Sequence, residues 1–480
     1  MRRAGGSSLR VKAFALLLRL QRRAGRLPVP VRSLGRKLLL RSSSAAPPPI
    51  DDWSEPCLVT SEVAEVAPPP HTTGAAAPPS YIRAAPGGAA VRCLVTTGVL
   101  DVGGMDEFVA FLARRLGSCG IATSVLHVGT SIDRNVGPGG RLAESLRAAG
   151  VPIADLEGRD GASWLAANRP DVISAHGAPA WVLQAAMASG IPYVETLHGM
   201  HSLFGVDWNE EDCRARGVTL FVAVSELVRQ QYLAGNSSFP ADRIVTIPNG
   251  VDTDRLPRVE RDAARKLLGL DDEFLFLSLG RHSLQKNSFG LVSAFAEVAQ
   301  PRPAAHLLIS GRVDDPTYAH HVRLLADQLP VRGRIHLRDH FPSPATLLAA
   351  ADCFVLDSFF EGWPLASMEA LYSGVPVVMS EVGGAREQVG EDGERGHLVP
   401  NPLGTPLLVD WETIRRAQFA PQTNRSALVA AMASVHDRRD EWLDRRSALH
   451  SYCKTTFRDT VCLEQHAQVL RQAALGSRPS

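Results

Sequence analysis

Short apolar runs alternate with stretches of helical periodicity along most of the chain. Between residues 91 and 247, helical periodicity lies between the apolar runs, for example over residues 107–116 and 180–188. This alternation of strands and helices predicts a parallel, doubly wound sheet. The strands expected in this part of the chain are residues 92–96, 123–127, 172–175, 193–196, 220–223 and 243–247.

The sequence Pro248-Asn249-Gly250 interrupts this pattern, and the alternation then restarts. We therefore expect two similar α/β domains in succession, with a ligand crevice at the carboxyl ends of their strands, between the domains. Residues 401–425 form a less regular insertion, and residues 460–475 predict a helix. The strands expected in the second domain are residues 274–279, 305–310, 335–337, 353–356 and 376–379.

Both ends of the chain depart from this pattern. Residues 43–90 are rich in Pro, Ala, Ser and Thr, which predicts an extended and poorly packed linker. We divide the chain into five parts accordingly. They are a basic leader (residues 1–42), the linker (43–90), a first domain (91–252), a second domain (253–455) and a C-terminal helix (456–480) that can pack back on the first domain.

Composition excludes several classes of protein. Of the 480 residues, 45% are hydrophobic and the formal net charge is +1, so neither global disorder nor a general attraction to nucleic acid is expected. No apolar run reaches the roughly 18–20 residues that a membrane-spanning helix needs. The seven cysteines are scattered and form no CxxC pair. This argues against disulfides and structural zinc and favours a reducing, cytoplasmic compartment.

The leader carries a strong positive charge. The first 50 residues contain Arg and Lys but no acidic residue, and residues 9–27 mix leucines with arginines in a way that a helix could partly segregate. Three interpretations stay open: an amphipathic helix on an anionic membrane surface, a cleaved targeting segment, or a basic tail without a role. The first would make a cytoplasmic protein peripheral on the inner face of the cell membrane.

The most informative segment contains two carboxylates eight positions apart. Glu361 lies in the turn after an expected strand, and Glu369 lies inside the helix that follows. Pro364 suits the first position of this helix, and Gly374 suits the position just past its end. On spacing alone, Glu361 is equally well explained as an acid favoured near a helix start, and Glu369 as a surface charge.

A second candidate segment follows the strand over residues 274–279. It contains Gly280, Arg281 and Lys286, and the chain has only five lysines. A turn here would direct backbone N–H groups and two cations toward the crevice, where Arg can grip a phosphate in a fork and Lys supplies a point charge. The alternative is an exposed loop with ordinary solvated charges.

Taken with its neighbours, the Glu361-x7-Glu369 spacing resembles the E-x7-E signature of the retaining GT-B glycosyltransferases, and the surrounding sequence looks most like glycosyltransferase family 4. The likeness covers roughly residues 91–475, strongly over 245–400 and weakly over 91–244, and is absent over 1–90. The other segments that carry it are Ser225-Glu226, residues 247–252, Gly280-Arg281 with Lys286, and residues 382–387. One departure is Asn287, where the family usually has glycine.

This resemblance implies a GT-B fold, in which two doubly wound Rossmann-like domains face each other across a cleft. The first domain would lie on the acceptor side, and the second would bind a nucleotide sugar. Glu369 would accept hydrogen bonds from the ribose, and Glu361 would hold the donor sugar. No carboxylate nucleophile is then expected. The residues implied in catalysis are Arg281, Lys286, Glu361 and His198, and those implied in donor binding are Gly104, Gly280, Gly362, Trp363, Pro364, Leu365 and Glu369.

In the first domain, the loop at Gly103-Gly104 follows a strand but does not spell the GxGxxG fingerprint, which argues against a Rossmann oxidoreductase. His198 ends another strand, and the resemblance places it near the donor sugar. His176 has a similar setting and is a weaker candidate. Asp252 and Asp254 spell DxD, but they stand at a domain junction where Asp favours turns. We therefore expect no metal and no other cofactor.

The sequence as a whole predicts a retaining, metal-independent glycosyltransferase. It would move a hexose from a nucleotide diphosphate sugar to a hydroxyl acceptor. The basic leader gives weak support for a lipid-linked or polysaccharide acceptor of cell-envelope synthesis. The alternative is a non-catalytic sugar-nucleotide-binding protein on the same fold, and the intact carboxylates and Arg281/Lys286 pair do not favour it.

Overall fold

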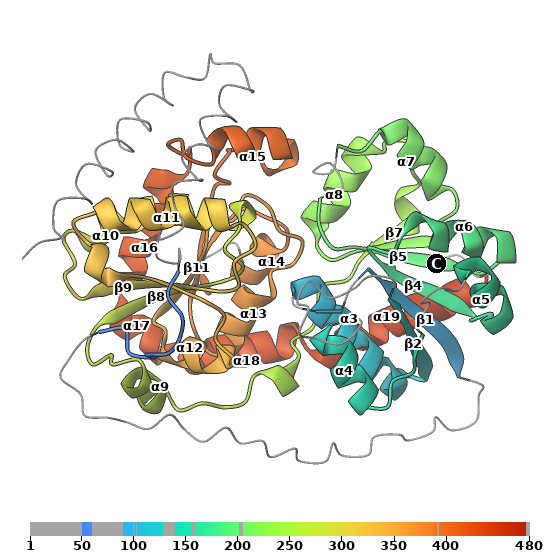
Figure 1. Ribbon diagram of the computed structural model, residues 1–480, viewed down its shortest axis with the longest axis horizontal. Helices are drawn as coiled ribbons and strands as arrows, with labels where there is room; N and C mark the ends of the chain where they lie inside the picture. Colours follow the sequence, from blue (N-terminus) through green and yellow to red (C-terminus); the bar gives the residue numbers. More distant parts are fainter. Residues whose placement is uncertain are drawn as a thin grey trace, which may run out of the picture. The chain divides into compact units, whose positions relative to one another are not determined.

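A computed structural model describes residues 50–59, 90–98, 100–101, 103–127, 140–154, 160–200, 205–390 and 393–476 (Figure 1). The basic leader over residues 1–42, with its amphipathic stretch at 9–27, lies outside the described residues. So does the linker apart from residues 50–59 and 90. In the described part of the chain, no helix is both long enough and apolar enough to cross a bilayer.

The first domain is built on a seven-stranded, fully parallel sheet with the strand order β3-β2-β1-β4-β5-β6-β7. All six strands expected from the sequence are present, and β3 was missed because it has only two residues. The strands are β1 Val91–Thr97, β2 Ile121–His127, β3 Ile153–Ala154, β4 Val172–His176, β5 Tyr193–Leu197, β6 Leu220–Ala223 and β7 Ile244–Thr246.

The second domain repeats this plan with a six-stranded parallel sheet, ordered β10-β9-β8-β11-β12-β13. The expected doubly wound α/β architecture is confirmed in both domains. Strand β13 was missed, because a glycine starts it and two of its four residues are only half-buried. The strands are β8 Phe274–Leu279, β9 Ala305–Ser310, β10 Ile335–Arg338, β11 Cys353–Leu356, β12 Val377–Ser380 and β13 Gly396–Val399.

Helices cover both faces of each sheet (Figure 1). In the first domain and the junction they are α3 Gly104–Arg115, α4 Arg141–Ala148, α5 Gly161–Asn168, α6 Ala180–Ser189, α7 Trp208–Ala215, α8 Glu226–Gly235 and the 3-10 turn η5 Thr253–Arg255. In the second domain they are α9 Arg261–Leu267, η6 Leu284–Lys286, α10 Ser288–Ala299, α11 Pro316–Gln328, α12 Pro344–Ala350, α13 Leu365–Tyr372, α14 Ala385–Val389, α15 Trp411–Ala417, α16 Arg425–Asp437, α17 Arg439–Asp444 and α18 Arg446–Thr456.

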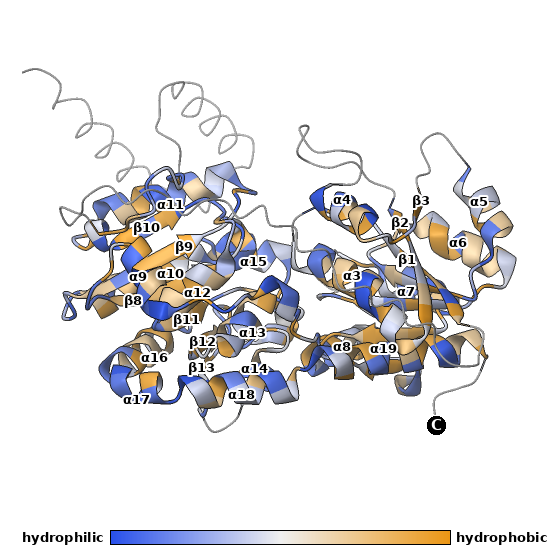
Figure 2. Cartoon of the chain, turned by 90° about the horizontal axis from the view of Figure 1, so that it is seen from below, coloured by the Kyte–Doolittle hydropathy of each residue, from blue (hydrophilic) through white to orange (hydrophobic). Residues whose placement is uncertain are grey.

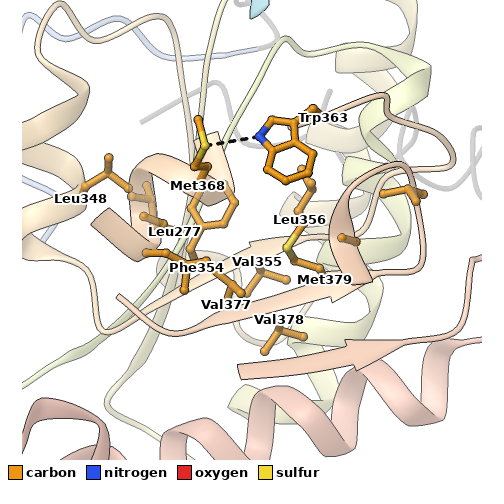
Figure 3. Packing of buried hydrophobic residues seen from close by; sticks show 14 of the residues in the cluster. Leu277, Leu348, Phe354, Val355, Leu356, Trp363, Met368, Val377, Val378 and Met379 are labelled. Carbon is orange, nitrogen blue, oxygen red and sulfur yellow. Dashed lines mark hydrogen bonds between the residues drawn. The ribbon is translucent and has the colours of Figure 1, made fainter. Parts of the chain in front are cut away.

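The strands form the apolar cores of the two domains. They are mostly hydrophobic, whereas the surrounding helices mix apolar and polar segments (Figure 2). This is expected for parallel sheets, which are buried on both faces. In the second domain, Phe354 of β11 lies beside Met368 of α13, and Val355 of β11 and Val377 of β12 belong to the same buried cluster (Figure 3). That packing fixes the loop between β11 and α13, which carries Glu361.

The last helix, α19 (Asp459–Ala474), returns to the first domain. Its Cys462, Leu463 and Ala467 share an apolar cluster with Val95 and Phe108 of that domain. The backbone N–H of Val251 donates to the Phe457 carbonyl at 2.9 Å. The segment that leads from the first domain to the second therefore lies beside the segment that leads back to α19. The first domain therefore needs the end of the chain to complete its core.

Residues 50–59 differ from the extended, poorly packed linker that their composition predicts. Asp51 pairs with the edge strand β10: its N–H donates to the Leu337 carbonyl at 2.9 Å, and its carbonyl accepts from the Asp339 N–H at 2.9 Å. Ile50 and Leu58 are buried against the second domain. An unpaired sheet edge is a template for another extended segment, and this segment covers it.

Candidate active site

Two loops of the second domain bring a cation and a carboxylate together. Lys286 follows β8 and Glu361 follows β11, and these strands are neighbours in the sheet. Their carboxyl ends therefore lie at the same edge, and Lys286 Nζ is 2.6 Å from Glu361 Oε1. Both side chains are mostly buried, with 18% and 8% exposed. A buried pair this close leaves neither charge uncompensated in the absence of a ligand.

Arg281 lies in the same loop as Lys286 but is more exposed. Its guanidinium donates to Asp314 Oδ2 at 2.6 Å and to Gln285 Oε1 at 3.2 Å. Across the cleft, burial raises the pKa of Asp106 on α3 to about 6, and the positive charge of Arg281 acts in the opposite direction. The Arg281 charge thus acts electrostatically on a side chain of the first domain.

Glu369 lies on α13 and is 7% exposed. Its Oε1 is 3.3 Å from the Arg255 guanidinium, whose Nε is 3.5 Å from Glu107 of α3. Burial raises the pKa of Glu369, and the Arg255 charge opposes this rise. These residues border a small pocket, lined by Glu107, Phe108, Phe111, Gly250, Asp252, Arg255, Leu365, Met368 and Glu369.

Arg255 is a site residue that was not identified from the sequence. It belongs to the turn η5 at the domain junction, and it bridges a carboxylate of the first domain to one of the second. In the sequence, Arg255 stands out only as an arginine next to Asp252 and Asp254 at the domain junction. Its partners stand far from it in sequence, so their pairing could not be read from spacing.

Close backbone approach explains two glycines of the site. A Cβ on Gly362 would overlap the carbonyl of His198, so the turn before α13 touches the end of β5. A Cβ on Gly104 would lie 3.8 Å from the Leu365 side chain, so the start of α3 faces the start of α13. The predicted residues Gly104, His198, Gly362 and Leu365 are thus brought together from the two domains.

His198 belongs to a buried group of imidazoles. Its Nε2 is 2.8 Å from His176 Nδ1, and His176 Nε2 is 3.0 Å from Ser174 Oγ. Burial lowers the pKa of His198 to about 3 and that of His466 to about 4, and it holds the pKa of His176 well below its usual value. All three rings are therefore neutral near pH 7.

His466 was also not identified from the sequence. It comes from α19, yet its ring centroid is 5.6 Å from that of Phe108, which in turn lies 5.7 Å from the ring of His198. A lone histidine on a C-terminal helix carries no sequence signal of a site. Its position depends on how α19 packs on the first domain.

The side chain of Trp363 lies in the core of the second domain. Its Nε1–H donates to Met368 Sδ at 3.3 Å (Figure 3). Its ring packs edge-on against Phe457. Pro364 caps the N-terminus of α13 and lacks an N–H of its own. Any contact of Trp363 with a ligand is therefore limited to its backbone, whereas its ring orients the loop.

Lys286 is followed by a residue in a left-handed conformation. Asn287 has φ 51° and ψ 35°, a region that glycine adopts without strain. This accounts for the glycine expected here from the resemblance. Asn is one of the few other residue types that visit this region routinely.

The DxD sequence at the junction is engaged in ion pairs. Asp252 Oδ2 is 2.8 Å from Arg114, and Asp254 Oδ2 is 3.0 Å from Arg115. Within the described ranges, no group of three His, Cys, Asp or Glu side chains is arranged to hold a metal ion. Both aspartates join the junction to α3.

Comparisons with known proteins agree with this geometry. Residues 102–255 match the family described as Glycosyltransferase Family 4, and residues 260–405 match Glycosyl transferases group 1. A D-inositol 3-phosphate glycosyltransferase of Xylanimonas cellulosilytica is 30% identical over 411 residues, covering 75% of this chain and 94% of that protein. A protein of the same description from Stackebrandtia nassauensis is 27% identical over 394 residues, covering 72% and 85%.

Solved structures show the same fold. HepE of Anabaena, in complex with UDP and glucose, superposes with a TM-score of 0.65 at 17% identity, covering 80% of this chain and all of that one. The sucrose-phosphate synthase of Thermosynechococcus elongatus gives a TM-score of 0.61 at 18% identity, with 80% and 100% covered. At this identity the likeness concerns the fold, which is GT-B.

Proposed function

This chain belongs to the group 1 glycosyltransferases of family 4, and from that membership we propose that it transfers a hexose from a nucleotide diphosphate sugar to a hydroxyl acceptor, with retention and without a metal. The observation that carries the proposal is the Lys286–Glu361 pair at 2.6 Å, at the carboxyl edge of the second sheet. Ligands of open α/β sheets bind at this edge.

Donor binding would replace the ion pairs of the cleft. The diphosphate would take Lys286 from Glu361 and would engage the exposed Arg281. Glu361 would then be free to accept hydroxyl groups of the sugar, and Glu369 those of the ribose. Preorganised cations aimed at the leaving group stabilise the negative charge that develops as the glycosidic bond breaks.

The transfer itself needs no carboxylate nucleophile. The acceptor oxygen forms a bond to the anomeric carbon on the face from which the diphosphate departs, and the bond from that carbon to the phosphate oxygen breaks. The acceptor proton passes to the departing phosphate, so configuration is retained and charge is balanced. His198 is neutral because it is buried, and it can hold a sugar hydroxyl by a hydrogen bond without transferring a proton.

The acceptor is proposed at the level of its chemistry. The first relative compared is named for D-inositol 3-phosphate, a phosphorylated cyclitol with free hydroxyl groups. The basic leader instead favours a lipid-linked or polysaccharide acceptor at an anionic membrane, with the protein cytoplasmic and peripheral. A variant without residues 1–42 should keep its activity and lose its sedimentation with anionic vesicles, and unchanged sedimentation would refute membrane attachment.

The experiment that tests the proposal measures nucleotide diphosphate release from a panel of UDP-, GDP- and ADP-sugars, each with and without inositol 3-phosphate. Glu369→Ala should weaken donor-specific release, whereas Glu297→Ala, which removes a half-exposed carboxylate of α10, should not. Product stereochemistry by NMR then decides between retention and inversion. If no sugar nucleotide is turned over and none raises the melting temperature, both the enzyme and the non-catalytic sugar-nucleotide-binding alternative are refuted.

A further inference from the structure

Asn287 and Asp357 lie directly behind the charged pair of the cleft. Asn287 follows Lys286, and Asp357 precedes Glu361 by four positions. Asn287 Nδ2 donates to Asp357 Oδ2 at 2.8 Å. Both side chains are buried, with 0% and 1% exposed, so neither meets a ligand directly.

The two loops are cross-linked at three successive levels. The Phe359 N–H donates to the Gln285 carbonyl at 2.9 Å, Lys286 pairs with Glu361 at 2.6 Å, and Asn287 bonds to Asp357. In the proposed function, the middle link opens when the diphosphate takes Lys286. The other links then have to hold the loops in place, together with Gln285 Nε2, which donates to the Phe360 carbonyl at 3.1 Å and to Glu361 Oε2 at 3.3 Å.

The Asn287 amide uses all of its hydrogen-bonding groups. Besides Asp357, its Nδ2 donates to Gln422 Oε1 at 2.7 Å, and its Oδ1 accepts from Gln422 Nε2 at 2.6 Å. Asp357 is held from its other oxygen by Asn424 Nδ2 at 2.7 Å. Asn424 Oδ1 is buried without a hydrogen-bond partner. Every side-chain nitrogen and oxygen of Asn287 and Asp357, in contrast, is bonded, and breaking one of these bonds would leave a buried polar group unpaired.

Two backbone features support a specific role for this amide. Among the described non-glycine residues, only Arg169 and Asn287 have a positive φ, so the chain accepts an asparagine where glycine would relieve strain. Gly290 lies in the first turn of α10, and a Cβ there would overlap the Asn287 and Gln422 amides. The chain thus leaves room in a helix for this network, although glycine weakens helices.

From these contacts we infer that Asn287 and Asp357 form a clamp that positions Lys286 for the diphosphate of the donor. Neither residue is catalytic, since both act through the loops that carry Lys286 and Glu361. This inference rests on the proposed function for its kinetic consequence. Its structural consequence, the placement of the Lys286 loop, holds for the protein without any substrate.

Asp357 is a buried carboxyl group, so its charged form depends on the hydrogen bonds that it accepts. Burial raises the pKa of Asp357 to about 7, and the hydrogen bonds from Asn424 and Asn287 act in the opposite direction. Burial raises the pKa of Tyr318 on α11, and the Asp357 charge adds to that rise. Without the Asn287 amide, Asp357 loses one of the two donors that favour its charged form, and the end of β11 loses an anchor.

The decisive variant is Asn287→Gly. Glycine keeps the left-handed backbone without strain and removes only the amide. We expect kcat for nucleotide diphosphate release to fall by about tenfold to a hundredfold, since misplacing a catalytic group by about 1 Å has a cost of that order. The donor KM should change less. Unchanged kcat would overturn the inference, because the Asn287 side chain would then have no part in positioning Lys286.

Two further variants separate positioning from folding. Asn287→Asp places two carboxylates against each other and should be severely impaired, and adding Asp357→Asn should restore activity, because the bond can then run in the reverse direction. A double variant no better than the single one would count against the clamp. Tyr232→Phe removes a buried hydroxyl that donates to Glu211 at 2.7 Å in the first domain. It should lower the melting temperature and leave kcat unchanged.

Hydrogen–deuterium exchange of the substrate-free protein provides a readout that does not depend on activity. In Asn287→Gly, amides of residues 284–291 and 357–361 should exchange faster, while those of α16 and β9 should not. If only the amide of residue 287 exchanged faster, the inference of a clamp would be overturned. If the wild-type protein proves inactive, the proposed function is refuted. Faster exchange in Asn287→Gly would still support the clamp in that case.

Discussion

The two domains present opposite chemistry to the cleft. The second domain contributes charges that are paired with each other, namely Lys286 with Glu361 and Arg281 with Asp314. The first domain contributes His198, which is held by the fully buried His176, and burial keeps both rings neutral. At the pocket, Glu107 of α3 is a carboxylate of the first domain, and it faces Arg255. Ion pairs exchange partners when a charged ligand arrives, whereas buried neutral imidazoles keep their hydrogen bonds. In the proposed function, the second domain would hold the diphosphate and the first domain would hold hydroxyl groups.

Loss of Lys286 should break this contrast most severely. Lys286→Ala removes the buried cation and leaves Glu361 with one fewer partner in the cleft. By analogy with the loss of one oxyanion donor, transition-state stabilisation should fall by about 2–4 kcal/mol, or about 30- to 900-fold in kcat/KM. Steady-state kinetics test this. The matched control is Lys266→Ala at the exposed end of α9, and an effect under tenfold at Lys286 would make it an ordinary surface charge.

Glu369→Ala should rank second. A hydrogen bond to a charged group contributes about 1.5–3 kcal/mol, so the donor KM should rise and kcat should fall. Removing Glu369 also deprives Arg255 of one of its two carboxylates. Arg255→Gln separates the effects, since it spares the carboxylate and should lower donor KM or leave it unchanged. Wild-type kinetics in Glu369→Ala would refute its assignment to the donor.

The neutral imidazoles should make the protein sensitive to acid. Their pKa values are lowered on folding, so the unfolded chain takes up protons below about pH 6.5 while the folded chain does not. Stability should be fully present above that pH and fall toward pH 4, by up to about 1.4 kcal/mol per pH unit for each ring. Asp106 and Asp357 oppose this trend, because their pKa values are raised on folding.

A variant isolates this contribution from the carboxyl groups. His466→Gln should flatten the fall of melting temperature between pH 6.5 and pH 4 relative to wild type. His320→Gln, at a half-exposed position of α11, should leave that slope unchanged. Equal slopes in the wild type and His466→Gln would show that His466 is not held neutral.

His198→Asn should have a smaller effect on the reaction. A neutral hydrogen bond contributes about 0.5–1.5 kcal/mol, so kcat/KM should fall by about threefold to tenfold. Because the pKa of His198 is lowered to about 3, activity should show no titration between pH 6 and pH 8 that vanishes in this variant. If such a step is found, His198 takes part as an acid or base.

Removal of metal ions should have the smallest effect. Asp252 and Asp254, the DxD residues, are committed to Arg114 and Arg115. Activity with EDTA should therefore equal activity without it. A loss that Mg²⁺ or Mn²⁺ restores would contradict the metal-independent mechanism.

Much of the second domain's site could be located from the sequence, and less of the first domain's. Arg281, Lys286 and Glu361 lie in two short loops that follow strands, and Glu369 lies in the helix after one of them. Local pattern located these segments, and the family resemblance singled out the residues. His466 reaches the His198 region only through the packing of α19. Two short strands were missed for a related reason: β3 and β13 are held by neighbouring strands, and their own residues show little apolar periodicity.

The sequence by itself determined the alternating strands and helices, the division into two α/β domains, and the loops that carry the candidate charges. These depend on residues close together in the chain. Only the tertiary structure decided how the charges pair. Lys286 and Glu361 are 75 positions apart, and Asn287 and Gln422 are 135 apart. Such pairs form because parallel strands bring the ends of distant loops to one edge, and burial then makes each polar group depend on its partner.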